Sequence, residues 1–147
     1  PYTIFFRDLF LLDSPKGKNM STIVNILFAV AMMPIILNFI SHYFKHKEFG
    51  VVDNNNPRQQ AASLSGPGSR SIAAQQNAWE ALALFSAAIL GAYLMGASAE
   101  QMLMPAYIFL AMRIAHALCY LADWAILRSI VWIIGLISCI WIIQLGS

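Results

Sequence analysis

The chain has 147 residues, of which 59% are hydrophobic and only 11% are charged, and its formal net charge at pH 7 is +2. Soluble domains carry about a quarter charged residues, so this composition, with a mean hydropathy of +0.64, indicates an integral membrane protein. The small net charge and the lack of a basic run with interleaved aromatics exclude nucleic acid as a partner. The length suits about four membrane helices, because each needs about 20 residues to cross the hydrocarbon core.

The first segment, residues 1–19, begins without methionine and has no clean helical stripe of apolar residues. We interpret it as an N-terminal extension of upstream or cloning origin, with Met20 as the natural start of the chain. The alternative is an interfacial helix, because the segment contains large apolar residues that include Ile4, Phe5, Phe6, Leu9, Phe10 and Leu11.

Residues 20–147 are predicted to form one all-α membrane domain, a bundle of four transmembrane helices. The apolar runs place the spans at about 20–44, 70–97, 101–124 and 128–146. Ser98 is a suitable N-cap for the third helix. Pro105 is expected in the first turn of that helix, where proline is well tolerated.

The polar connection 45–69 is rich in Pro, Gly, Asn and Ser, which is typical of a loop. This connection, its far edge and the start of the fourth span carry most of the cations that flank the spans: Lys45, Lys47, Arg58, Arg70 and Arg128. The short second connection offers only Glu100. By the positive-inside tendency, the 45–69 loop is expected in the cytoplasm and both termini on the other side.

Two polar stripes inside the apolar sequence are the strongest functional signal. The second span carries Arg70, Asn77 and Glu80, and the third carries Arg113, His116, Tyr120 and Asp123. A helix with about 3.6 residues per turn brings positions three, seven and ten apart onto one face. A charge at membrane depth costs at least a few kcal/mol unless it finds a partner or water. The stripes therefore predict a polar site between helices.

Side-chain chemistry suggests roles for the second-span stripe. Arg70 can recognise a carboxylate through a two-point fork, and Asn77 supplies both a donor and an acceptor. Glu80 can hold an ammonium group, so the stripe complements a zwitterionic, peptide-like ligand. The alternative is that Glu80 pairs with Arg113 and only fastens the two helices, since buried polar groups in membranes need partners whatever the function.

The third-span stripe suggests stabilisation of a negative charge. Tyr120 is a candidate donor to a thiolate or an oxyanion, and Arg128, just beyond the helix, is a candidate to stabilise the same charge. His116 is a candidate general base, and its alternative role is a hydrogen-bonded structural group. The sequence contains no phosphate-binding glycine loop, nucleophile elbow or zinc-protease motif.

No metal site is expected. His116 has no second histidine within helical spacing, and His42 and His46 are interpreted as a chance pair in a solvated turn beside lysines. Cys119 and Cys139 both fall inside predicted spans, so we expect neither a structural disulfide nor a paired-cysteine metal site.

Three segments of the sequence resemble the MAPEG family, a name that covers membrane-associated proteins in eicosanoid and glutathione metabolism. They are Asp53-Asn54 with Pro57-Arg58, residues 70–80 (RSIAAQQNAWE) and residues 113–121 (RIAHALCYL). The loop element resembles the bacterial branch of the family. The resemblance covers the chain from Met20 to the C-terminus.

The resemblance implies a homotrimer of four-helix bundles in the bilayer, in this case the bacterial inner membrane. It also implies glutathione as a thiol co-substrate, bound in a cleft between adjacent subunits. Carried over position by position, the glutathione contacts are Arg70, Gln75, Asn77, Glu80, Arg113, His116 and Tyr120. Tyr120 and Arg128 become the catalytic residues, because a cation close to the sulfur lowers the pKa of the thiol.

The function implied by the resemblance is that of a glutathione-dependent transferase or peroxidase acting on lipophilic small-molecule electrophiles. Where close eukaryotic relatives carry an arginine four residues before the asparagine, this chain has Ala73. That cationic contact is lost unless Arg58 or Lys45 replaces it from the loop. Two alternatives stay open: an enzyme of the same architecture that uses another thiol or a lipid ligand, and a non-catalytic trimeric scaffold.

Overall fold

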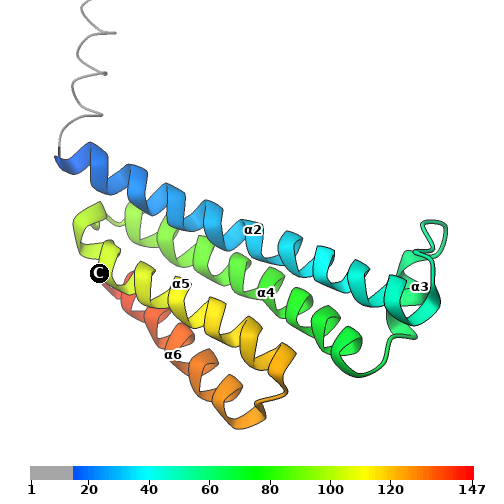
Figure 1. Cartoon of the computed structure of the whole chain (residues 1–147). Helices are drawn as coiled ribbons and strands as arrows, with labels where there is room; N and C mark the ends of the chain where they lie inside the picture. The colour runs from blue at the N-terminus through cyan, green and yellow to red at the C-terminus, as the bar shows by residue number, and fades with distance from the viewer. Residues whose placement is uncertain (1–14) are drawn as a thin grey trace, which may run out of the picture.

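The computed structural model of the chain describes residues 15–147, which form four long helices and one short helix (Figure 1). The long helices are α2 (Pro15–Phe49), α4 (Gly66–Leu94), α5 (Ala99–Ala122) and α6 (Ala125–Gln144). Each of the four is long and apolar enough to cross a membrane. The prediction of an all-α membrane protein with four spans is therefore confirmed.

The first helix is longer than the predicted span. α2 begins at Pro15 and continues through Pro34 to Phe49, so it crosses the expected limit between residues 19 and 20. The alternative interfacial helix, with its apolar residues at positions 4–11, lies outside the described residues.

The start of α5 is fixed by a capping box, which confirms Ser98 as the N-cap. The backbone N–H of Gln101 donates to Ser98 Oγ at 3.3 Å, and the N–H of Ser98 donates to Gln101 Oε1 at 2.9 Å. Because these two bonds begin the helix at Ala99, Pro105 lies in the second turn. The expectation of a first-turn proline was wrong for this reason.

The connection between α2 and α4 is more regular than a loop. α2 extends to Phe49, and a short helix, α3 (Pro57–Ala62), begins at a proline, which suits the first helical position. The Gln60 side chain ties the intervening turn to α3, accepting from Asp53 N at 2.9 Å and donating to Val51 O at 2.7 Å. The expectation of an irregular polar connection is therefore wrong for α3 and for the end of α2.

Asp53 closes this turn on itself. Its Oδ1 accepts hydrogen bonds from the backbone N–H groups of Asn55 at 2.8 Å and Asn56 at 3.0 Å. These bonds, that from Asn56 foremost, hold the pKa of the carboxyl below its ordinary value of 3.8. Because the pKa is depressed in the folded state, the stabilisation is present above pH 3.8 and is lost as the pH falls through the lowered value.

Replacing Asp53 with alanine is expected to raise amide hydrogen exchange at Asn55 and Asn56 several-fold at neutral pH, because both N–H groups lose their acceptor. Exchange measured by mass spectrometry or NMR tests this expectation. Asp53→Asn, which keeps an acceptor oxygen, is the control and should retain part of the protection. Unchanged exchange in the alanine variant would mean that the bonds do not order the turn.

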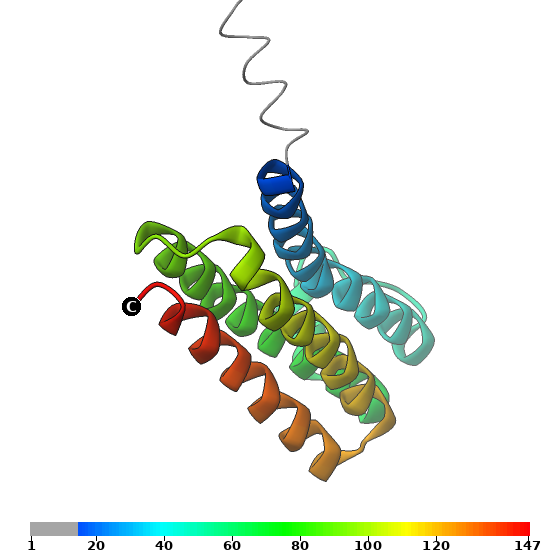
Figure 2. The same cartoon turned by 90° about the vertical axis from the view of Figure 1, so that its left-hand side faces the viewer.

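The four long helices pack in layers. α4 and α5 form the middle of the bundle, α2 packs against both of them, and α6 packs against both from another side (Figure 2). Between α4 and α5 the rings of Phe85 and Phe109 stack with centroids 4.3 Å apart. Small side chains such as Ala88 and Ala92 on α4 are also buried, which lets the helices approach closely.

The outside of the bundle is apolar. Large hydrophobic side chains are exposed on every long helix, for example Phe28 (65% exposed), Leu94 (74%), Leu118 (58%) and Ile126 (81%). Faces of this kind are stable against lipid tails or against another apolar helix. The fold therefore supports a bilayer as the direct surroundings of the protein.

The two ends of the bundle differ. The start of α2, the α4–α5 turn and the C-terminus gather at one end (Figure 1). α3, the start of α4 and the junction between α5 and α6 lie at the other, which we call the loop end. The two polar stripes run toward this loop end, since Arg70 begins α4 and Asp123 follows α5.

Candidate functional site

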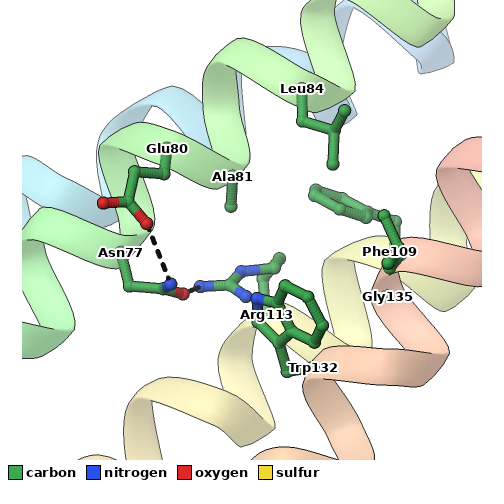
Figure 3. Close-up of a pocket in the computed structure, with 9 residues that line it drawn as sticks. Asn77, Glu80, Ala81, Leu84, Phe109, Arg113, Trp132 and Gly135 are labelled. Carbon is green, nitrogen blue, oxygen red and sulfur yellow. Dashed lines mark hydrogen bonds between the residues drawn. The ribbon is translucent and has the colours of Figure 1, made fainter.

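A series of polar contacts joins α4 to α5. The Asn77 amide lies at its centre: Nδ2 donates to Glu80 Oε2 at 3.2 Å, and Oδ1 accepts from Arg113 Nη2 at 2.6 Å (Figure 3). Arg113 Nη2 also lies 3.2 Å from His116 Nδ1. Because a guanidinium can only donate, this contact requires Nδ1 to accept and the ring proton to sit on Nε2.

The series continues toward the loop end. The rings of His116 and Tyr120 meet edge to face with centroids 5.1 Å apart, and the guanidinium carbon of Arg128 lies 4.4 Å from the Tyr120 ring centroid. The face of an aromatic ring attracts a cation at this distance. Asp123 allows this geometry, because it ends α5 in the left-handed conformation (φ 62°) and the chain reverses at once into α6.

The middle of the series is buried within the bundle. Arg113 and His116 are only 4% and 3% exposed, whereas Glu80 lies at the surface. The Nε of Arg113 is buried and has no hydrogen-bond partner among the described residues. An unsatisfied donor of this kind costs about 1–3 kcal/mol, so it favours a ligand that brings an acceptor.

A small cavity opens beside Arg113. It has a volume of about 100 Å³, and its lining combines Asn77, Glu80 and Arg113 with the apolar walls of Phe109 and Trp132 (Figure 3). Pockets for drug-sized ligands measure about 300 Å³ or more, so this cavity alone is too small for a peptide-sized ligand. Sequence reasoning missed both aromatic residues, because an apolar helix gives no sign of which side chains face a cavity.

Arg70 does not join the series. Its Nη1 pairs with Asp123 Oδ2 at 3.3 Å, which links the start of α4 to the end of α5. Its Nε is buried, and no residue from 15 to 147 forms a hydrogen bond with it. Asp123, the last member of the third-span stripe, is thus the partner of Arg70. In the described part of the chain, Glu80 reaches Arg113 only through Asn77, so the direct Glu80–Arg113 pair considered above does not form.

Gln75 is also separate from the series. It lines a second cavity between α2, α3 and α4, together with His42, Lys45 and Arg58. Residues two positions apart on a helix point about 200° apart, which is why Gln75 and Asn77 face different sides of α4. The interpretation of His42 as part of a solvated turn was wrong, because α2 continues past it.

Comparison with known proteins agrees with this architecture. The model of the MAPEG family matches residues 21–146, a range that includes all of the contact series and the last three long helices. Searches of curated proteins and of solved structures each return no significant match. Because the family model covers nearly the whole chain, the protein belongs to the MAPEG family of glutathione-related membrane enzymes.

Proposed function

We propose that the protein is a glutathione-dependent membrane transferase or peroxidase that acts on lipophilic electrophiles from the bilayer. Family membership and the apolar outer surface support this proposal. The observation that carries it is the contact series, which connects ligand-binding groups at Glu80 and Asn77 to the pair of Tyr120 and Arg128.

The chemistry of these residues fits glutathione, which has two carboxylates, an ammonium group and two amides. Glu80 offers an exposed carboxylate for the ammonium group, and Arg70 offers a guanidinium for a carboxylate. The unpartnered Nε of Arg113 can donate to an amide or carboxylate oxygen. These complementary groups favour binding of the tripeptide along α4, beside Arg113.

Bound glutathione supplies the nucleophilic sulfur of the reaction. We assign Arg128 the role of holding a positive charge where negative charge develops on that sulfur, and Tyr120 the role of a nearby donor. The Tyr120 ring holds the Arg128 guanidinium at the junction of α5 and α6. Phe109 and Trp132 provide apolar walls that exclude water beside the polar groups.

We further propose a homotrimer of the bacterial branch, in which a second subunit completes the site. The 100 Å³ cavity is smaller than a peptide ligand needs, and apolar side chains are exposed on all long helices. The cations at the loop end support an inner-membrane topology with this end in the cytoplasm and both termini away from it.

The first test is a titration of glutathione into the detergent-purified protein, followed by the ultraviolet absorbance of the thiolate. We expect a saturable thiolate signal at neutral pH. S-methylglutathione, which has no ionisable thiol, is the control and should give heat of binding without the signal. No signal and no heat with glutathione would contradict the proposal and favour another thiol or a lipid ligand, an alternative supported by Ala73.

A non-catalytic scaffold is the second candidate. The 2.6 Å bond between Arg113 and Asn77 supports it, because this bond joins α4 to α5 whether or not a ligand is present. For a scaffold, replacing Asn77 should impair assembly, measured by light scattering in detergent. Glutathione should then have no effect on the thermal stability of the parent protein.

The ion pair of Arg70 and Asp123 is expected to compete with a ligand carboxylate. Asp123→Asn removes the competing charge while keeping the size of the side chain, so glutathione affinity should rise. The gain should be about two- to fivefold, because exposed ion pairs are worth at most about 1 kcal/mol. Calorimetry tests this, with Glu100→Gln at the other end of α5 as the control. Unchanged or weaker binding would mean that Arg70 does not meet the carboxylate.

A further inference from the structure

The second cavity lies at the loop end, on another side of α4 from the contact series. It has a volume of about 500 Å³, is lined by α2, α3 and α4, and is open on one side. Its polar lining consists of Asn38, His42, Lys45, Arg58, Gln75 and Gln76. The lining contains the cations of Lys45 and Arg58 and no carboxylate, so the cavity favours a negatively charged occupant.

Lys45 carries most of this argument. Its side chain is only 3% exposed, and its Nζ donates to the carbonyl oxygen of Pro57 at 3.1 Å. An ammonium group has three donors, and in the described part of the chain Lys45 has neither a second acceptor nor a carboxylate partner. Buried lysines are normally paired, because an unpaired buried charge is costly. The structure thus holds a buried positive charge that no described carboxylate neutralises.

The two acidic residues that follow Lys45 in the sequence, Glu48 in α2 and Asp53 in the turn after it, are engaged elsewhere. Glu48 accepts from Ser65, with Oε2 bonded to the backbone N–H at 3.2 Å and Oε1 to the hydroxyl at 2.9 Å. Asp53 accepts from the backbone of Asn55 and Asn56. Neither carboxylate lines the cavity. The charge of Lys45 is therefore not neutralised by either of these two carboxylates.

The lining groups come from three separate elements. His42 and Lys45 are three positions apart on α2 and share one face, Arg58 belongs to α3, and Gln75 and Gln76 belong to α4. The bond from Lys45 to Pro57 places α3 over the end of α2. Two cations with amide N–H groups around one space form a set of donors suited to the oxygens of a phosphate.

We propose that this cavity binds a phosphate-type anion, either the headgroup phosphate of an anionic phospholipid or a soluble phosphate. The level of the cavity relative to the bilayer favours the lipid, because Lys45 directly follows the uncharged run 20–44 that spans the bilayer. Basic pockets between membrane helices at this level bind anionic headgroups. The cavity is separate from the contact series, since neither Arg113 nor Arg128 lines it, and of the glutathione contacts that the family resemblance implies it holds only Gln75.

The full chain tests the proposal in nanodiscs of phosphatidylcholine with and without phosphatidylglycerol. Native mass spectrometry counts the phosphatidylglycerol retained per chain, and calorimetry in detergent measures inorganic phosphate. We expect Lys45→Met and Arg58→Gln to weaken binding about tenfold each, as expected for loss of a charge-assisted bond. Lys47→Met is the matched control, because it removes the same charge two residues away and Lys47 lines a different surface pocket.

The outcomes separate the possible occupants. Retention of phosphatidylglycerol without phosphate binding supports a lipid headgroup, and phosphate binding with the same dependence on Lys45 and Arg58 supports a soluble ligand. An equal loss of binding in Lys47→Met would mean that surface charge alone holds the anion and would overturn the site, as would no binding of either probe.

Arg58 is exposed on α3, so Arg58→Gln keeps the test valid if Lys45→Met does not fold. Loss of glutathione affinity alone in these variants would assign the cavity to the thiol site instead.

Discussion

Replacing Arg128 with alanine is expected to remove thiolate formation while leaving glutathione affinity nearly unchanged. A free thiol with a pKa of about 8.5 is only a few per cent ionised at pH 7. A cation within a few ångströms lowers such a pKa by about 1–3 units, so its loss should reduce the thiolate signal at pH 7 by about tenfold or more. The groups at Asn77 and Glu80 that we propose bind the ligand are untouched by the change, which is why affinity should persist.

The measurement is the ultraviolet thiolate signal against glutathione concentration, with calorimetry for affinity. Arg128→Lys keeps the positive charge and should retain part of the signal. If the alanine variant ionised glutathione as well as the parent, the role assigned to Arg128 would be wrong. A parallel loss of affinity would instead make Arg128 a binding residue.

Replacing Asn77 with leucine is expected to destabilise the bundle by about 2 kcal/mol. Neutral hydrogen bonds between membrane helices average only about 0.6 kcal/mol, but a bond from a charged donor is worth about 1.5–3 kcal/mol. The Arg113 guanidinium is 4% exposed and would lose the acceptor that lies 2.6 Å away. Unfolding in mixed detergent micelles measures the change, and Gln76→Leu, an exposed neighbour on α4, is the matched control.

A double replacement separates the bond from general effects of leucine. The double variant, Asn77→Leu with Arg113→Met, removes donor and acceptor together. Its loss of stability should therefore be smaller than the sum of the losses in the two single variants. The expected coupling energy is about 1–2 kcal/mol. Strict additivity, or an Asn77→Leu variant as stable as Gln76→Leu, would mean that the bond does not fasten α4 to α5.

Much of the fold follows from local sequence properties. Long, predominantly apolar stretches identify the four spans, and the pairing of Ser98 with Gln101 fixes one boundary through bonds between neighbours in the chain. The spacing of the third-span stripe places Arg113, His116 and Tyr120 on one face, and the contacts of these residues bear this out. These features depend on helix geometry, which is the same in every protein.

Other features depend on packing between distant segments and could not be read from spacing. The pairing of Arg70 with Asp123 joins residues 53 positions apart. The burial of Lys45 depends on α3 folding back over α2, and a polar loop of this composition does not reveal that contact. Gln75 was included through family resemblance alone, although its spacing from Asn77 already placed it on another side of the helix.

The number of residues in the short junction between α5 and α6 is fixed by the position of Arg128. Tyr120 and Arg128 meet because only Asp123 and Trp124 separate the two helices. Adding or deleting one residue there would turn the first residues of α6 by about 100° about its axis and carry Arg128 away from the ring. The exposed loop before α3 can accept an inserted residue. The junction between α5 and α6 cannot, because its length sets the angular position of Arg128 on α6.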